Sequence, residues 1–266
     1  MKNLIVAICG DESLHKTWVE GNPEFDLCIF YYGDNKEKYK NEATLYDQAK
    51  GTKFVILDQM AKKYADFFDK YDAILVPDDD LYITTEDWNR FFKIFHAYQM
   101  KLAQPSILGW QCVFTSCPNA NYILRYTNWV EIMTPCFNQE TFQKLKKTFA
   151  ENKTNWGIDF LWIKLLESPK TGVGIIDDVV AIHTRPCFYG DTYWRNKNSC
   201  DDAIKEITDL RVKYDIQEEI CVYGGVERDR YAYDQNGSED KFMPGNCKVL
   251  KELINSLRRK KVGKFI

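Results

Sequence analysis

Short apolar runs alternate with longer amphipathic segments along most of the chain. Four of these runs have the length of buried strands in a parallel sheet, and they cover residues 4–9, 27–32, 54–57 and 73–76. Residues 60–70 have the spacing of an amphipathic helix, and Thr84 and Asp87 form a capping pattern ahead of an aromatic-rich helix. This alternation predicts an α/β fold with a mostly parallel sheet flanked by helices, in which ligands bind beyond the carboxyl ends of the strands.

The second half of the chain has a mixed pattern. We expect strands at 107–114, 130–133, 173–176 and 179–183, a helix over 139–150, and another helix that follows the turn at Trp156 and Gly157 and runs to 166. From about residue 191 the periodicity weakens; residues 223–245 are typical of a loop and residues 248–261 of a final helix. We therefore expect one α/β domain over 1–190, with residues 191–266 as a C-terminal helical extension packed on it.

Composition narrows the function classes. The 266 residues are 45% hydrophobic and 28% charged, as in a folded globular protein, and a formal net charge of -3 gives no global attraction to nucleic acid. No stretch approaches the roughly 18 apolar residues of a membrane span, so the basic residues 258–264 allow at most weak peripheral contact with a membrane. The cysteines number 9 and are scattered, which predicts reduced thiols and a cytoplasmic location. Nothing in the composition indicates the oligomeric state.

Three carboxylates follow the predicted strand at 73–76. Adjacent Asp78, Asp79 and Asp80 repel one another unless a cation or hydrogen-bond donors compensate. Strand-like alternation would point Asp78 and Asp80 the same way, which suits a hard divalent cation that keeps other positions for ligand phosphates. A solvated acidic turn is the alternative, but the position at the carboxyl end of a predicted central strand favours the cation site.

Two other residues are candidates for chemistry. Asp159 starts an apolar helix just after Trp156, where it could cap the helix or act as a general base whose apolar surroundings raise its pKa; the motif alone favours neither. His183 ends the predicted strand 179–183. A lone histidine at a strand end is more often structural, yet among the 3 histidines it is the best candidate for a nitrogen ligand.

Together these segments resemble the GT-A nucleotide-sugar glycosyltransferases, in particular a glycosyltransferase-like family of plants, bacteria and large algal viruses. The resemblance covers roughly residues 4–186. It lies in the acidic triplet, in the block 129–137, in the turn 156–160, and in Ile176 and Asp177 with His183 after them.

The resemblance implies a role for each candidate residue. Asp78 and Asp80 would be the DXD pair that holds Mn²⁺ or Mg²⁺, with His183 completing the metal site. The other implied positions are Gly10, Asp11 and Asp79 in the nucleotide pocket, Lys53 and Asp58 as weaker candidates beside the third strand, and Glu131 and Trp156 on the sugar and acceptor side. Trp110 lies by a predicted strand and is a further candidate ring for stacking on a sugar.

The implied reaction moves a sugar from a nucleotide-sugar donor to a hydroxyl of a glycan acceptor. A UDP-sugar is favoured because UDP is the commoner donor nucleotide in GT-A enzymes. Asp159 would be the base, and a single displacement would invert the anomeric carbon, although the sequence also permits a retaining course. Two rivals are a glycoside hydrolase that uses Asp80 and Asp159, and a non-catalytic, cation-dependent module that binds a sugar or a nucleotide.

Overall fold

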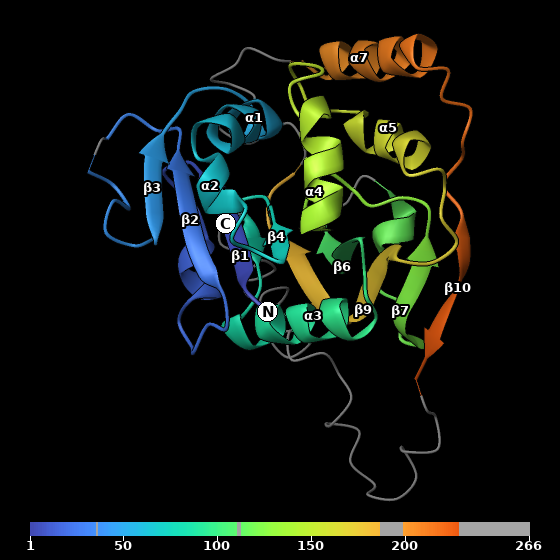
Figure 1. Cartoon of the computed structure of the whole chain (residues 1–266), viewed down its shortest axis with the longest axis horizontal. Helices are drawn as coiled ribbons and strands as arrows, with labels where there is room; N and C mark the ends of the chain where they lie inside the picture. Colours follow the sequence, from blue (N-terminus) through green and yellow to red (C-terminus); the bar gives the residue numbers. More distant parts are fainter. Residues whose placement is uncertain (36, 111–112, 187–198, 229–266) are drawn as a thin grey trace, which may run out of the picture.

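One continuous sheet runs through the part of the chain that this computed structural model describes, residues 1–35, 37–110, 113–186 and 199–228. Its strands are β1 (Asn3–Cys9), β2 (Asp26–Tyr31), β3 (Leu45–Gln48), β4 (Ala73–Leu75), β5 (Leu81–Tyr82), β6 (Leu102–Gly109), β7 (Tyr122–Thr127), β8 (Cys136–Asn138), β9 (Val173–His183) and β10 (Val222–Glu227). Their order is β10-β7-β9-β6-β8-β4-β1-β2-β3, with β5 paired to β9, so β3 and β10 form the two edges (Figure 1).

Strand direction decides which ends of the sheet meet. β3, β2, β1 and β4 are parallel, and β8 runs antiparallel between β4 and β6. β9 is parallel to β6, so β4 and β9 point the same way although they are far apart in the sequence. The residues that follow these two strands therefore lie at the same edge of the sheet, as the predicted α/β fold requires.

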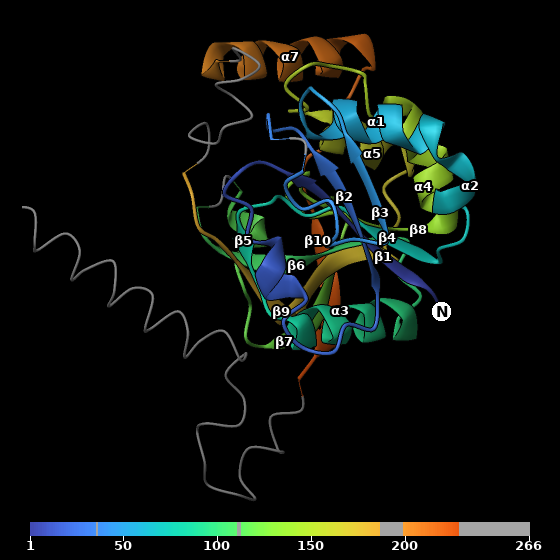
Figure 2. The same ribbon diagram turned by 90° about the vertical axis from the view of Figure 1, so that its left-hand side faces the viewer.

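Helices cover both faces of the sheet (Figure 2). They are α1 (Lys53–Lys63), α2 (Ala65–Phe68), α3 (Thr85–Ala97), α4 (Gln139–Leu145), α5 (Ile158–Leu165) and α7 (Cys200–Lys213), with single 3₁₀ turns at His15–Trp18, Phe114–Ser116 and Lys146–Thr148. Alternate residues of β1 separate the two cores: Leu4 and Val6 pack with α1, α2, α4 and α5, whereas Ile5 and Ala7 pack with α3. Among the described residues, no helix has the length and apolar composition to cross a membrane.

The first half confirms most of the predicted elements and corrects one. Strands predicted at 4–9, 27–32 and 73–76 are β1, β2 and β4, and the Thr84 hydroxyl accepts a hydrogen bond from the Asp87 amide at 3.2 Å at the start of α3. The strand predicted at 54–57 is wrong, because these residues form the first turns of α1. The third parallel strand is β3, and the helix predicted at 60–70 is the end of α1 followed by α2.

The second half differs more from the prediction. Residues 130–133 form a turn between β7 and β8 instead of a strand, and the strands predicted at 173–176 and 179–183 are one strand, β9. The strand predicted at 107–114 shares only residues 107–109 with β6; residues 111–112 lie outside the described residues, and Phe114 begins a 3₁₀ turn. The edge strand β10 covers the first residues of the loop predicted at 223–245, and the sequence did not predict α7. The helix predicted at 248–261 and the basic residues 258–264 lie outside the described residues.

Candidate functional site

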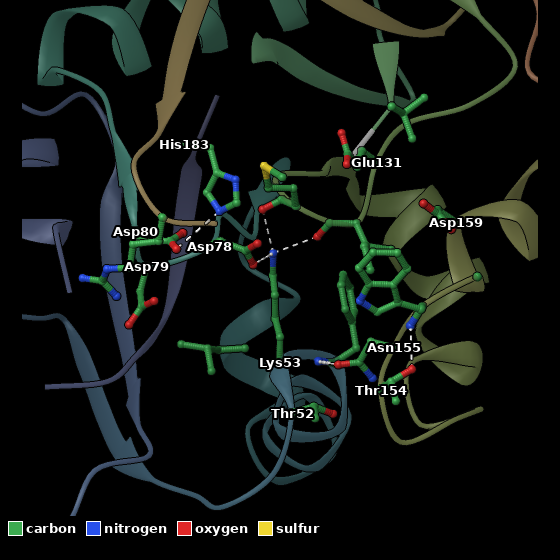
Figure 3. Close-up of a pocket in the computed structure, with 18 of the residues that line it drawn as sticks. Thr52, Lys53, Asp78, Asp79, Asp80, Glu131, Thr154, Asn155, Asp159 and His183 are labelled. Carbon is green, nitrogen blue, oxygen red and sulfur yellow. Dashed lines mark hydrogen bonds and ion pairs between the residues drawn. The ribbon is translucent and has the colours of Figure 1, made fainter. Parts of the chain in front are cut away.

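Three potential metal ligands meet at the carboxyl edge of the sheet (Figure 3). Asp78 and Asp80 follow β4, and β5 then pairs with β9 so that Leu81 is opposite His183. One ligand atom from each of Asp78, Asp80 and His183 lies within 4.8 Å of the others, and His183 Nε2 is 3.3 Å from Asp80 Oδ2. Pairing of the two strands thus brings together side chains that are more than a hundred residues apart.

The chemistry of this cluster fits a divalent cation. Asp80 is only 9% exposed, and its Oδ1 has no hydrogen-bond partner among the described residues. His183 contacts the carbonyl oxygen of Trp110 through Nδ1, which leaves Nε2 turned toward the carboxylates. Two carboxylates and an imidazole nitrogen suit Mn²⁺ or Mg²⁺ in a site that keeps positions for a ligand.

The acidic triplet is electrostatically unfavourable in the absence of a cation. Burial raises the pKa of Asp78; the charge of Lys53 opposes this shift, and the charge of Asp80 adds to it. Burial likewise raises the pKa of Asp79 to about 7, with a hydrogen bond from the Gly10 amide opposing the shift and Asp80 increasing it. The triplet therefore favours a bound positive charge.

His183 already supplies part of that charge. Burial alone would lower the pKa of His183, but the hydrogen bond and the charge of Asp80 outweigh it and raise the pKa to about 9. A proton on His183 and a divalent cation would compensate the same carboxylates, so binding of the cation would replace this proton.

Lys53 reaches the cluster from the first turn of α1. Its Nζ donates to Asp78 Oδ1 at 2.7 Å and to the carbonyl oxygens of Ile132 and Met133, both at 2.8 Å. The lysine side chain is 14% exposed, and burial lowers its pKa while Asp78 opposes the change. The sequence placed Lys53 beside a strand, but the structure places it in the first turn of α1. Its side chain joins α1 to the end of β4 and to the 131–134 turn.

The loop after β1 holds the middle carboxylate of the triplet. The Gly10 amide donates to Asp79 Oδ2 at 2.6 Å, and a Cβ atom at Gly10 would lie 2.4 Å from the Tyr32 hydroxyl. Asp11 accepts from the Tyr31 hydroxyl at 2.5 Å. Gly10 is therefore beside the triplet and Asp11 follows it in the chain, but neither lines the cavity described below. Asp58 pairs with Lys62 one turn along α1 at 2.7 Å and does not line the cavity either, so the structure separates it from the other candidates.

A cavity of about 330 Å³ opens in front of the triplet. One side is charged, and the other side is mostly apolar and comes from the loop 154–157 and α5 (Figure 3). The residues proposed from the sequence that line it are Lys53, Asp78, Asp79, Asp80, Glu131, Trp156, Asp159 and His183. A cavity of this size, with a mostly apolar lining and a few convergent polar groups, is typical of small-molecule sites.

Asp159 lies on the side of the cavity away from the triplet, in the first turn of α5. It is 6% exposed, and burial raises its pKa to about 6 even though the Phe160 amide donates to Oδ1 at 3.0 Å. Gly157 starts the helix with φ +89°, a conformation that favours glycine. The hydrogen bond from the Phe160 amide stabilises the first turn of α5. The same carboxylate also lines the cavity.

Glu131 and the two candidate tryptophans differ in their positions. Glu131 is 5% exposed, accepts from the Ser116 hydroxyl at 2.7 Å and lines the cavity. Trp156 also lines the cavity, on its apolar side. Trp110 does not line the cavity; it is 56% exposed, and its contacts with the site are the backbone hydrogen bonds that it makes with His183.

Sequence reasoning missed several residues of the cavity wall, among them Arg185, Asn155 and Ile207. Arg185 lies two positions after His183, and Asn155 precedes Trp156 and accepts from the Phe54 amide at 2.9 Å. Each lies close in the chain to a residue that the sequence analysis had selected, and this proximity is the only sequence signal that could have identified them. Ile207 of α7 also lines the cavity, and no local pattern in the sequence marks it.

Comparisons with known proteins give a match in structure only. No family model matches the sequence, and no curated protein matches it. The 1–349 fragment of TarS from S. aureus, solved in complex with UDP-GlcNAc, superposes with a TM-score of 0.51 at 13% identity, over 82% of this chain and 68% of that one. The chain has a GT-A-like fold.

Two other structures are similar over most of this chain. TarS from S. aureus gives a TM-score of 0.48 at 11% identity over 80% of this chain, and the match spans 44% of the TarS chain. A protein named as a putative nucleotide-diphospho-sugar transferase from Desulfovibrio desulfuricans G20 gives a TM-score of 0.42 at 11% identity, over 80% of this chain and 96% of that one.

Proposed function

We propose that this protein is a metal-dependent glycosyltransferase that moves a sugar from a nucleotide-sugar donor to a hydroxyl of a glycan acceptor. The observation that carries the proposal is one cavity with the Asp78, Asp80 and His183 cluster on one side and the buried carboxylate of Asp159 on another. The GT-A-like fold supports this assignment, and the neighbour solved with UDP-GlcNAc favours a UDP-sugar as the donor.

The charged side of the cavity would bind the donor. Asp78, Asp80 and His183 would hold Mn²⁺ or Mg²⁺, and the ion would neutralise the negative charge that develops on the diphosphate leaving group. Asp79, fixed by the Gly10 amide, and the neighbouring Asp11 would contact the nucleotide or its sugar. Lys53 keeps Asp78 in place, because its three hydrogen bonds are all made to protein oxygens.

The other side would bind the acceptor. Asp159 would take the proton from the attacking hydroxyl, and its pKa of about 6 leaves it ionised at neutral pH and still basic enough for this role. Trp156 and Phe160 would stack on sugar faces and exclude water, while Glu131 would orient sugar hydroxyls. A single displacement with Asp159 as the base inverts the anomeric carbon.

The test is a screen of UDP- and GDP-sugars with Mn²⁺ that records thermal shift, sugar transfer and slow hydrolysis of the donor. We expect one UDP-sugar to stabilise the protein and to be hydrolysed only when the divalent ion is present. Glycosidase activity that survives a chelator would instead support a two-carboxylate hydrolase. Tight binding of a nucleotide sugar with neither transfer nor hydrolysis would support a binding module.

None of the described cysteines forms a disulfide, and this supports the further proposal of a cytoplasmic location.

A further inference from the structure

Glu206 of α7 accepts three hydrogen bonds from the loop that lines the apolar side of the cavity. The backbone amide of Lys153 donates to its Oε1 at 3.2 Å, and the amide and the hydroxyl of Thr154 donate to its Oε2 at 2.8 and 2.5 Å. The Thr154 hydroxyl in turn accepts from the Trp156 amide at 3.3 Å. One carboxylate thus fixes the backbone just before Trp156 through charge-assisted hydrogen bonds.

The next residue of α7 touches the same loop. A Cβ atom at Gly157 would lie 3.1 Å from the Cα atom of Ile207, so the backbones of the loop and the helix are in close contact. Ile207 also lines the cavity. Figure 1 shows α7 lying over α5, and the two helices are in contact.

The opposite side of the loop is bound to α1. The Thr52 hydroxyl donates to the carbonyl oxygen of Lys153 at 2.7 Å, and the Phe54 amide donates to Asn155 Oδ1 at 2.9 Å. Lys53 lies between these two residues and reaches Asp78. The loop is therefore held between α7 and the start of α1, and it adopts φ +69° at Asn155 and +89° at Gly157. A backbone in these unusual conformations needs such contacts on both sides to keep one shape.

We propose that Glu206 is a positioning residue, which holds the loop 152–157 so that Trp156 and Asp159 face the acceptor side of the cavity. Helix α7, which lies beyond residue 190, is then part of the working site. The expected effect of Glu206 on sugar transfer rests on the proposed glycosyltransferase function. The expected effect of Glu206 on the conformation of the loop does not.

On α7 only Ala203 and Leu210 are buried, so this helix is attached by little apolar surface. Polar contacts attach it as well: those of Glu206, the ion pair of Lys213 with Glu151, and the Arg211 guanidinium, which lies 5.2 Å from the centroid of the Phe160 ring.

The experiment compares Glu206→Ala and Glu206→Gln with Asp209→Asn, a matched control at an exposed position of the same helix. Amide hydrogen exchange over residues 153–157, the affinity for UDP with Mn²⁺, and kcat and KM for transfer are measured on each full-length variant. In Glu206→Ala we expect exchange of these amides to be at least about tenfold faster. We expect kcat to fall by about 10- to 100-fold while the UDP dissociation constant stays within about twofold of the wild type.

Glu206→Gln should be intermediate, because its carbonyl oxygen can still accept from one amide while its NH₂ group opposes the other. Asp209→Asn should match the wild type. Unchanged exchange at 153–157 in Glu206→Ala would overturn the proposal. A loss of UDP affinity as large as the loss of kcat would also overturn it, because it would show a general effect on the fold.

Thr154→Val provides a second route if Glu206→Ala does not fold. Its effect on kcat should be clearly non-additive with that of Glu206→Gln, and strict additivity would contradict a shared role. If the wild-type protein transfers no sugar from any donor, the proposed function fails, and hydrogen exchange and UDP binding still decide whether Glu206 holds the loop.

Discussion

The ammonium nitrogen of Lys53 lies 2.7 Å from Asp78 Oδ1, at a point where the first turn of α1 meets the end of β4. The same nitrogen donates to the carbonyl oxygens of Ile132 and Met133. The buried ammonium group of Lys53 thus joins three segments around the acidic triplet. It neutralises part of the negative charge of the triplet, and a divalent ion would neutralise the rest.

Replacement of Lys53 by Met should destabilise the protein by roughly 1–3 kcal/mol, because Asp78 and two carbonyl oxygens lose their donor. The variant should gain more from Mn²⁺ in a thermal shift assay than the wild type does, since the ion then compensates more of the charge. Lys62→Met is the control, because Lys62 is on the same helix but its side chain is 75% exposed. Equal melting temperatures for the two variants would contradict the role given to Lys53.

Replacement of Asp80 by Ala should weaken Mn²⁺-dependent binding of UDP by at least about tenfold at every metal concentration, because it removes a carboxylate of the proposed metal site. Isothermal titration calorimetry with and without a chelator measures this. Asp58→Ala removes a carboxylate that does not line the cavity and should leave the affinity unchanged. Undiminished UDP affinity in Asp80→Ala would exclude Asp80 as a ligand.

Replacement of Asp159 by Asn should lower kcat by about 10²- to 10⁴-fold and leave UDP binding intact, because the amide keeps the shape but cannot accept a proton. In the wild type, kcat should rise as the pH increases through about 6, where the buried carboxyl ionises, and then level off. Transfer rates measured across this range should lack that rise in the variant. A variant with normal turnover would remove Asp159 from the base role.

The same substitution should stabilise the fold at neutral pH. Burial raises the pKa of Asp159 from 3.8 in an exposed carboxyl to about 6, so ionisation costs the folded state up to about 3 kcal/mol. This cost is absent below the unfolded-state pKa and develops as the pH rises through the folded-state value. Chemical denaturation should therefore show the advantage of Asp159→Asn growing from pH 4 to pH 7, and an advantage that shrinks with pH would refute the burial argument.

The acidic triplet shows what sequence reasoning can reach. An apolar run followed at once by Asp78, Asp79 and Asp80 is a local signal, and it predicted both β4 and the edge at which the carboxylates lie. His183 was placed by the same logic at the end of β9. Parallel strands then bring such ends together without further information from the sequence.

Two kinds of error have different physical causes. The apolar run at 54–57 fits a strand or a helix equally well; in α1 its buried residues continue to Met60 and Ala61, whereas the true strand β3 is only partly buried and half polar. Helix α7 buries only Ala203 and Leu210, so its apolar period is weak. The contacts of Lys53 with Asp78 and of Glu206 with Thr154 join distant segments and leave no local trace.

The pairing of Leu81 with His183 has a consequence for how the site tolerates changes in chain length. Along β9 the ladder with β6 passes from Ile176 directly to Val180, so residues 177–179 lie outside the pairing. These three residues are buried all the same, and Asp177 pairs with Arg125 and Asp178 with Arg90. The loss of a single residue between Val180 and His183 would turn the imidazole to the other face of the sheet, away from both carboxylates. The spacing of the cluster is thus set by the main-chain hydrogen bonds of β9, and the segment from Val180 to His183 cannot change its length without separating the imidazole from the two carboxylates.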